Sequence, residues 1–277
     1  MSATTNKKIP GCITQRDNEY RVIRLKVLAA NISSEHMAIV SDVAKRYGRS
    51  YVSLTSRMGI EIPWVPAESF EAAVEELKEA GFTVGSTGPS VRAIVSCKGT
   101  VCRYGLEDTQ EICRRLDEKY YGMKTPAKFK IGITGCPNNC IKTQLNDLGF
   151  MGQSVPEYNQ ELCIQCNACI EACKVNAISE TDDGVEIDTS KCINCGSCIR
   201  VCPTEAITSK EKGLAVYLGG KFGRKYRIGE RMNKIYDVDE LVELTGKLLD
   251  FYKENADGKE RFGDMLDRLN IDIDTLV

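Results

Sequence analysis

Cysteine is the residue type with the most chemistry to offer in this sequence. The 277-residue chain has 14 cysteines and a single histidine, His36. Most of the cysteines fall in short runs, and short C-x-x-C spacing favours a shared metal over disulfide bonds. One histidine leaves most zinc, copper and ordinary haem schemes without ligands, so thiolate ligation points to iron–sulfur clusters, zinc or a thiolate-bound tetrapyrrole.

Eight cysteines belong to an internal repeat. The segments CIQCNACIEACK and CINCGSCIRVCP each read C-x2-C-x2-C-x3-C. In this pattern three cysteines hold one 4Fe-4S cluster and the fourth reaches across to the other cluster. The segment resembles bacterial two-cluster ferredoxins, although its first run ends in Cys173-Lys174, and paired zinc knuckles are the alternative. We expect one cluster on Cys163, Cys166, Cys169 and Cys202, and the other on Cys192, Cys195, Cys198 and Cys173.

Four more cysteines form two tight pairs outside the repeat. The first pair is Cys97 and Cys102, and the second is Cys136 and Cys140 in CPNNC. Two pairs on separate loops suit a third 4Fe-4S cluster, and a zinc site with the same thiolates is the alternative.

Cations accompany these pairs. Lys128 and Lys130 lie two apart in an expected strand, so they point to one face, and Arg24 and Lys26 form a similar pair. Arg92 lies on the strand before Cys97. Like charges side by side repel unless an anion lies between them, so the pattern indicates an anion site, with a solvated strand edge as the alternative.

The elements expected to position these residues are short and alternate in type. An alternating strand at 20–28, a capped helix from Ser33 or Ser34 to Tyr47, strands at 51–54 and 60–65 and a helix at 68–80 read β-α-β-β-α. This order is half of a ferredoxin-like sandwich. Further along we expect strands at 91–96, 128–134 and 216–218 and helices at 107–121, 137–145, 239–252 and 260–269.

Composition is that of a globular protein, with 42% hydrophobic and 27% charged residues and a net charge of −2. Residues 157–210 hold four basic and nine acidic residues, a net of −5, so the rest carries +3. This balance argues against nucleic-acid binding. No apolar run approaches the roughly 18 residues of a membrane helix, and the start lacks a signal-peptide core, so we expect a cytoplasmic protein without membrane insertion.

Several motifs together resemble the siroheme-dependent sulfite and nitrite reductase family, from about residue 21 to about residue 270. They are Arg24 in VIRLKV, Arg57 in LTSRMGIEI, Arg92 in VRAIVSC, the KFK and CPNNC segments, and GGKFGR from Gly219. A ferredoxin module inserted after CPNNC is similar to the anaerobic and dissimilatory branch. The chain departs from the usual pattern in Leu28-Ala29-Ala30-Asn31, where relatives often have Pro-Gly-Gly, and in Cys97-Lys98-Gly99, where they often have Cys-Pro-Gly.

The resemblance implies one siroheme and three 4Fe-4S clusters. It implies that Cys97, Cys102, Cys136 and Cys140 hold the third cluster, with Cys140 also bridging to the siroheme iron. Substrate-binding positions match Arg24, Arg92, Lys128 and Lys130. Positions that bind the siroheme match Arg57, Gly220, Lys221 and Arg224, which suits a cofactor rich in carboxylates.

The implied fold is α/β (α+β): a ferredoxin-like half-domain and a siroheme-binding α/β domain with an inserted two-cluster ferredoxin module. The expected domains are 1–90, 91–156 with 211–277, and the insert at 157–210. One copy of the core in the chain implies a homo- or hetero-oligomer. No G-x-G-x-x-G follows a strand, so we expect electrons from a separate donor protein or subunit.

The implied activity is the six-electron reduction of sulfite to sulfide. Alternatives are reduction of nitrite to ammonia at the same site and a dissimilatory reaction that passes partly reduced sulfur to a carrier protein. Two non-enzymatic alternatives are a three-cluster electron carrier and a siroheme-binding protein for storage or sensing.

Overall fold

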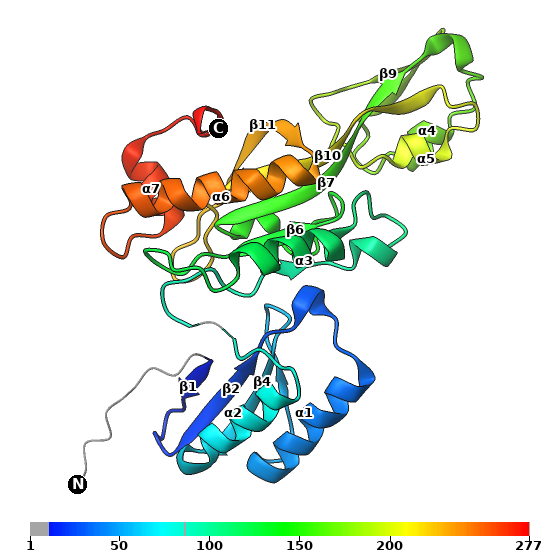
Figure 1. Ribbon diagram of the computed structural model, residues 1–277. Coiled ribbons are helices and arrows are strands. Elements are labelled where there is room, and N and C mark those ends of the chain that lie inside the picture. The colour runs from blue at the N-terminus through cyan, green and yellow to red at the C-terminus, as the bar shows by residue number, and fades with distance from the viewer. Residues whose placement is uncertain (1–10, 86, 277) are drawn as a thin grey trace.

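The computed structural model describes residues 11–85 and 87–276, which form two sheets with helices and one projecting segment (Figure 1). The first sheet is antiparallel with the order β1-β2-β4-β3. Helices α1 (Ser34–Tyr47) and α2 (Phe70–Glu79) share a core with it, and Ile23 and Leu25 face that core. Its strands are β1 (Cys12–Thr14), β2 (Tyr20–Leu25), β3 (Ser53–Leu54) and β4 (Ile60–Pro66).

Local signals explain this first unit. The Ser33 side chain accepts a hydrogen bond from the His36 amide at 3.1 Å, and Gly48 ends α1, which confirms the predicted helix. Short 3-10 helices follow β2 at Leu28–Ala30 and precede α2 at Ala67–Ser69. The order β-α-β-β-α is confirmed, and β1 is an added edge strand that the sequence pattern did not predict.

The second sheet has the order β11-β10-β7-β6-β5. Strands β5, β6 and β7 run parallel, whereas β7, β10 and β11 pair antiparallel. Helices α3 (Thr109–Tyr120), α6 (Val238–Asn255) and α7 (Phe262–Leu269) share one core with it, and Figure 1 shows α3 and α6 lying across the sheet. Its strands are β5 (Val95–Ser96), β6 (Ile131–Thr134), β7 (Leu148–Tyr158), β10 (Ile207–Leu218) and β11 (Glu230–Tyr236).

Several expectations in this part were wrong in detail. Strands β7 and β11 were not expected, β10 is far longer than the expected 216–218, and β5 occupies only the last two residues of the expected 91–96. Residues 137–145 form turns and a single 3-10 helix at Thr143–Leu145, because Asn139 (φ 51°) and Lys142 (φ 55°) adopt left-handed backbone. Helix α6 begins earlier than expected, with Asp237 as its cap in a capping box with Glu240. The strand expected at 128–134 begins only at Ile131, so Lys128 and Lys130 lie in the segment before β6. Phe129 between them is fully buried.

Residues 159–206 leave the second sheet at the end of β7 and return at the start of β10 (Figure 1). They surround a small core of their own that includes Ile178 and Val185. Among the described residues, no helix is both long and apolar enough to cross a membrane. The segment contains a 3-10 helix (Gln160–Leu162), α4 (Ala168–Ala172), the hairpin β8 (Ile178–Thr181) and β9 (Gly184–Ile187), and α5 (Ser197–Val201).

Candidate active site

A cavity of about 280 Å³ lies between the two sheets and is lined by cationic side chains from both. None of the described Asp or Glu residues lines it. A cavity walled by charge of one sign concentrates small ions of the opposite sign. The cations are Arg24, Lys26, Arg57, Arg92, Lys128 and Lys130.

Strand β2 supplies Arg24. Its partner across the ladder is Glu61 on β4, and the Arg24 Nε donates to Glu61 Oε1 at 2.7 Å. The chain passes closely beside it at Gly85, whose amide donates to the Arg24 carbonyl at 2.7 Å. A Cβ at Gly85 would lie 3.1 Å from Arg24 Cγ, so glycine makes room for the arginine beside the cavity.

Lys26 links the two sheets through an ion pair. Its Nζ lies 2.5 Å from Asp117 Oδ2 on α3 and 4.1 Å from the centre of the Tyr121 ring. Burial raises the pKa of Asp117, and Lys26 opposes that change. Asp117 balances the charge of Lys26 as Glu61 balances that of Arg24, so these two cations contribute less net charge to the cavity than their number suggests.

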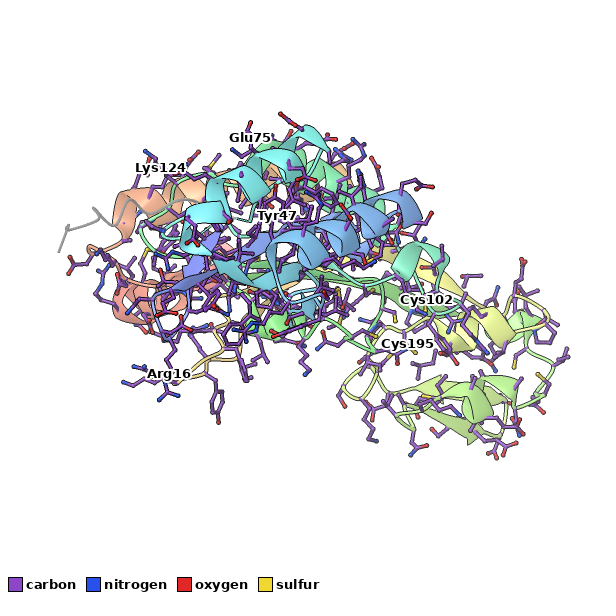
Figure 2. All side chains as sticks on the ribbon, turned by 90° about the horizontal axis from the view of Figure 1, so that it is seen from below. Arg16, Tyr47, Glu75, Cys102, Lys124 and Cys195 are labelled. Atoms are coloured by element: carbon purple, nitrogen blue, oxygen red, sulfur yellow. The ribbon has the colours of Figure 1, made fainter. Side chains whose placement is uncertain are left out.

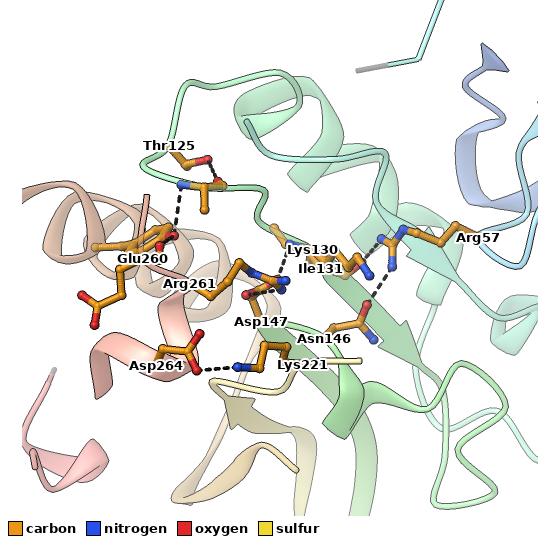
Figure 3. A network of polar contacts seen from close by, with 12 residues as sticks. Arg57, Thr125, Lys130, Ile131, Asn146, Asp147, Lys221, Glu260, Arg261 and Asp264 are labelled. Carbon is orange, nitrogen blue, oxygen red and sulfur yellow. Dashed lines mark hydrogen bonds and ion pairs between the residues drawn. The ribbon is translucent and has the colours of Figure 1, made fainter. Parts of the chain in front are cut away.

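The turn between β3 and β4 supplies Arg57, which reaches into the second sheet (Figure 3). Its guanidinium donates to Asn146 Oδ1 and the Ala93 carbonyl, both at 2.9 Å. The buried Arg57 Nε has no hydrogen-bond partner within the described residues. Burial, with a smaller contribution from Arg92, lowers the pKa of Arg57 to about 10, and the charge of Asp147 opposes this change.

Lys128, Lys130 and Arg92 line the side of the cavity that belongs to the second sheet. Burial, together with the charges of Arg57, Lys128 and Arg261, lowers the pKa of Lys130 to about 8, and Asp147 acts in the opposite direction. Arg92 is half-buried, and burial also lowers its pKa, as does the charge of Arg24. Burial is the main cause of both shifts and neighbouring cations add to it, so a bound anion would favour the charged forms of these side chains.

A buried carboxylate stands behind this wall. Asp147 is fully buried, and both of its oxygens accept from Arg261 Nη2 at 2.8 Å (Figure 3). The amide of Lys130 also donates to Asp147, at 2.9 Å. Burial raises the pKa of Asp147, and Arg261 opposes that change. Sequence reasoning missed both residues, and the one local signal was an acidic residue directly before an apolar strand.

The loop after β10 lies near this network but not on the cavity wall. Lys221 pairs with Asp264, and its backbone pairs with Arg227. A Cβ on Gly220 would lie 2.1 Å from the Gln144 carbonyl, so only glycine fits there. Arg224 is exposed. Thus Gly220, Lys221 and Arg224 are not among the residues that line the 280 Å³ cavity.

The two cysteine pairs outside the repeat begin beyond the carboxyl ends of two neighbouring strands of the second sheet. Cys97 follows β5 and Cys136 follows β6, and these strands are parallel neighbours. Burial raises the pKa of the Cys136 thiol, and the charges of Cys97, Cys102 and Cys140 add to the effect, so the four sulfurs lie near one another.

Close packing holds these two loops together. A Cβ on Gly99 would lie 3.1 Å from Gly135 Cα and 2.7 Å from Thr109. The buried Thr109 hydroxyl accepts from the Gly99 amide at 3.0 Å and donates to the Cys97 carbonyl at 2.7 Å. Thr109 therefore fixes the Cys97 loop, a role that no spacing in the sequence indicated.

The eight cysteines of the internal repeat line two separate hollows in residues 159–206. In the described part of the chain, no group of three or more His, Cys, Asp or Glu side chains could hold a single metal ion. The first hollow is lined by Cys163, Cys166, Cys169 and Cys202, and the second by Cys173, Cys192, Cys195 and Cys198. Their roles as cluster ligands stay predictions.

The chemistry of these donor sets fits the cofactors that the sequence implies. Thiolates are soft ligands that suit iron–sulfur clusters. The cationic cavity, with the unpartnered Nε of Arg57, suits the carboxylates of siroheme and a small oxyanion. Cations with lowered pKa values can also exchange protons with a bound anion.

Two family models match this chain. Residues 13–80 match the nitrite/sulfite reductase ferredoxin-like half domain, and residues 87–272 match the nitrite and sulphite reductase 4Fe-4S domain. The first match corresponds to the first sheet with its helices, and the second contains the second sheet and the projecting segment.

Individual relatives agree with these matches. The chain is 40% identical over 228 residues to the coenzyme F420-dependent sulfite reductase of Methanocaldococcus jannaschii, a match that covers 82% of this chain but only 36% of that protein. It is 28% identical to one of the subunits of the anaerobic sulfite reductase of Salmonella typhimurium, over 87% of this chain and 80% of that one.

The solved structures show the same fold. The crystal structure of dissimilatory sulfite reductase I matches with a TM-score of 0.75 at 20% identity, over 93% of this chain and 68% of that chain.

Proposed function

This chain belongs to the nitrite and sulphite reductase family of oxidoreductases, and we propose that it reduces sulfite to sulfide at a siroheme linked to a 4Fe-4S cluster through Cys140. Two further clusters, which the eight cysteines of residues 157–210 would hold, would supply electrons to that centre. The observation that carries the proposal is the cation-lined cavity between the sheets. A simple electron carrier has no use for such a cavity.

Binding of the substrate falls to Arg24, Arg92, Lys128 and Lys130. Their charges meet at one cavity, and sulfite is a small anion with oxygens that accept hydrogen bonds. The arginines keep their charge throughout, whereas the lysines are compact ammonium groups that can also release a proton. Both properties suit a substrate that loses its oxygens as water.

Proton delivery falls to Lys130. Each oxygen of sulfite that leaves as water takes up two protons, so the site has to supply protons as well as electrons. With a pKa of about 8, Lys130 is mostly protonated at neutral pH and still able to donate. Its backbone amide is held by Asp147, which fixes the position of the chain beside the cavity.

Siroheme, when bound, supplies the iron at which the sulfur is reduced. Arg57, Gly220, Lys221 and Arg224 are the residues of this chain proposed to bind it. Cys97, Cys102 and Cys136 are proposed to hold the third cluster together with Cys140. A shared cluster would explain why these four thiols lie near one another beyond β5 and β6.

Sulfite is preferred to nitrite because the relatives that match most of this chain at 40% and 28% identity are named sulfite reductases. The match spans only 36% of the F420-dependent protein. A separate protein or subunit is proposed as the electron donor, because no G-x-G-x-x-G follows a strand in this sequence. The Salmonella relative is named as one part of a larger enzyme, which supports an oligomeric enzyme here.

Anaerobic purification tests this proposal. We expect siroheme absorption bands and about thirteen iron atoms per chain, from three clusters and one siroheme. Turnover with reduced methyl viologen should be faster with sulfite than with nitrite. About eight iron atoms and no siroheme bands would leave only an electron carrier, and faster nitrite turnover would reassign the substrate.

A further inference from the structure

The two cysteine hollows of residues 159–206 differ in how they meet the rest of the molecule. We call the hollow that includes Cys192 and Cys195 the inner set and the one that includes Cys163 and Cys166 the outer set. The inner set is tied to the second sheet, because the Ser154 amide of β7 donates to the Asn194 carbonyl at 2.9 Å and Ser154 bridges to Cys195.

More contacts join the inner set to the loops of the third cluster. Arg200 lies two residues after Cys198 of the inner set, and Tyr104 lies two residues after Cys102. The Arg200 guanidinium is 5.8 Å from the centre of the Tyr104 ring. A cavity of about 390 Å³ is shared by Cys192 and Asn194 on one side and Pro137 and Asn139 on the other. A Cβ on Gly196, next to Cys195, would lie 3.4 Å from Leu106 Cδ2, and Figure 2 labels Cys102 and Cys195 in the region where the segment meets the body of the protein.

The outer set takes no part in the contacts named above, and the apolar side chains beside it are more exposed than Ile193 beside Cys192, which is 41% exposed. Leu162 is 49% exposed and Ile164 is 62% exposed, and they flank Cys163 directly in the chain. Cys166 is also exposed. Exposed apolar side chains beside ligands of a redox centre form the kind of patch at which another protein binds.

Acidic residues of the β8–β9 hairpin lie beside this patch. The tip of the β8–β9 hairpin lies against the outer loop, since Gln165 Nε2 donates to the Asp182 carbonyl at 3.2 Å and Asn167 Nδ2 donates to Glu180 Oε1 at 3.1 Å. Asp182 and Asp183 at that tip are exposed. Residues 157–173 contain no Lys or Arg at all, so negative charge dominates the outer set.

We propose that electrons enter this chain at the outer set, from a redox protein that binds over Leu162 and Ile164 and presents basic residues to the β8–β9 hairpin. In each encounter one electron leaves the reduced redox group of the donor, which is oxidised, and reduces the cluster of the outer set. The inner set then lies between that cluster and the third one. This inference rests on the proposed function only in assuming that the electrons are finally used to reduce sulfite.

The test uses a c-type cytochrome with a lysine-rich rim as the probe. The holoprotein is reduced, freed of excess reductant and mixed with ferric cytochrome in a stopped-flow instrument, and haem reduction gives a second-order rate constant. At low ionic strength Asp182→Lys/Asp183→Lys should lower that constant about tenfold, and high salt should remove the difference. Ile164→Ser should lower it a few-fold at every salt concentration, because it removes apolar contact.

The matched control reverses two exposed acids on α6, Glu243→Lys/Glu254→Lys, and should change the rate less than about twofold. Iron content shows whether each variant keeps its clusters, and Asp182→Asn/Asp183→Asn gives the same readout with a milder change. A hairpin variant that matches the α6 control overturns the inference. Absence of siroheme would overturn the proposed function and still leave this rate measurable.

Discussion

Lys130 is the cavity residue whose ionisation lies closest to neutral pH. Burial and the positive charges of Arg57, Lys128 and Arg261 lower its pKa to about 8, and the buried Asp147 acts in the opposite direction. A group with this pKa combines a large protonated fraction at neutral pH with a useful tendency to donate. The lowered pKa of Lys130 is therefore suited to the proton donation proposed for this side chain.

The pH dependence of turnover should report this lysine. We expect kcat/KM for sulfite to fall as the pH rises through about 8, because the protonated amine is lost above its pKa. The fall in kcat should come at a higher pH, since a bound anion favours the charged form. Lys130→Ala should lower kcat/KM about 100-fold, and Lys130→Arg should remove the fall near pH 8.

The control for this prediction is Lys124→Ala, which removes an exposed lysine that does not line the cavity. It should leave the profile unchanged. Methyl viologen assays of the wild-type protein provide the measurement, and a profile that stays flat from about pH 7 to about 9.5 would show that Lys130 donates no proton in the slow step.

At the scale of elements, the pair of Asp147 and Arg261 joins the start of β7 to the start of α7, 114 residues apart. Asp147 raises the pKa of Lys130, whereas Arg261 lowers it. Asp147→Asn should therefore move the fall in kcat/KM to lower pH, and Arg261→Gln should move it to higher pH. A shift of both variants in the same direction would contradict this assignment.

Stability should respond to the same pair. Breaking a buried ion pair leaves one charge without its partner and costs about 3–5 kcal/mol, so Arg261→Gln should lower the free energy of unfolding by roughly this amount. The double variant should lose less than the sum of the single losses, because it leaves no lone buried charge. Urea unfolding of the four proteins measures this coupling.

These elements also show what the sequence could predict and what it could not. The caps and apolar spacing of α1, and the alternation in β2, are local signals that the structure confirms. The helix expected from Pro137 failed because Asn139 and Lys142 take left-handed backbone and the Asn139 side chain accepts from the Thr143 amide at 2.8 Å. The contact between Asp147 and Arg261 could not be predicted, because the two residues are 114 positions apart and no local sequence pattern links them.

Two alanines after β2 adopt a backbone conformation that L-residues disfavour. Ala29 (φ 50°) and Ala30 (φ 60°) occupy the left-handed region. Ala30 is exposed, so Ala30→Gly removes only a Cβ that clashes with its own backbone. It should raise the free energy of unfolding by roughly 0.5–1 kcal/mol in urea titrations.

The matched control is Ala38→Gly, at an exposed position inside α1. There the same replacement should lower the free energy of unfolding by about 1 kcal/mol, because glycine weakens a helix interior. If both variants lose stability equally, the left-handed backbone at Ala30 carries no strain that glycine relieves.

At the scale of the whole molecule, charge and topology separate two tasks. Positive charge lines the cavity between the sheets, whereas residues 157–210 carry a net of −5. Strands β7 and β10 stay paired as far as Tyr158 and Ile207, so the segment between them is inserted at the end of an intact ladder. The core of the second sheet draws its buried residues from outside residues 159–206.

This topology predicts that the inserted segment can be removed. Because Tyr158 and Ile207 are cross-strand partners, an Asn-Gly turn in place of residues 159–206 should close the ladder as a hairpin. The shortened protein should lose about eight iron atoms and keep its siroheme bands and sulfite reduction by methyl viologen. Its oxidation by the basic cytochrome should slow at least about tenfold, since the outer set is gone. Loss of siroheme from a shortened protein that still folds would mean instead that the contacts of Asn194 and Arg200 help to hold the cofactor site together.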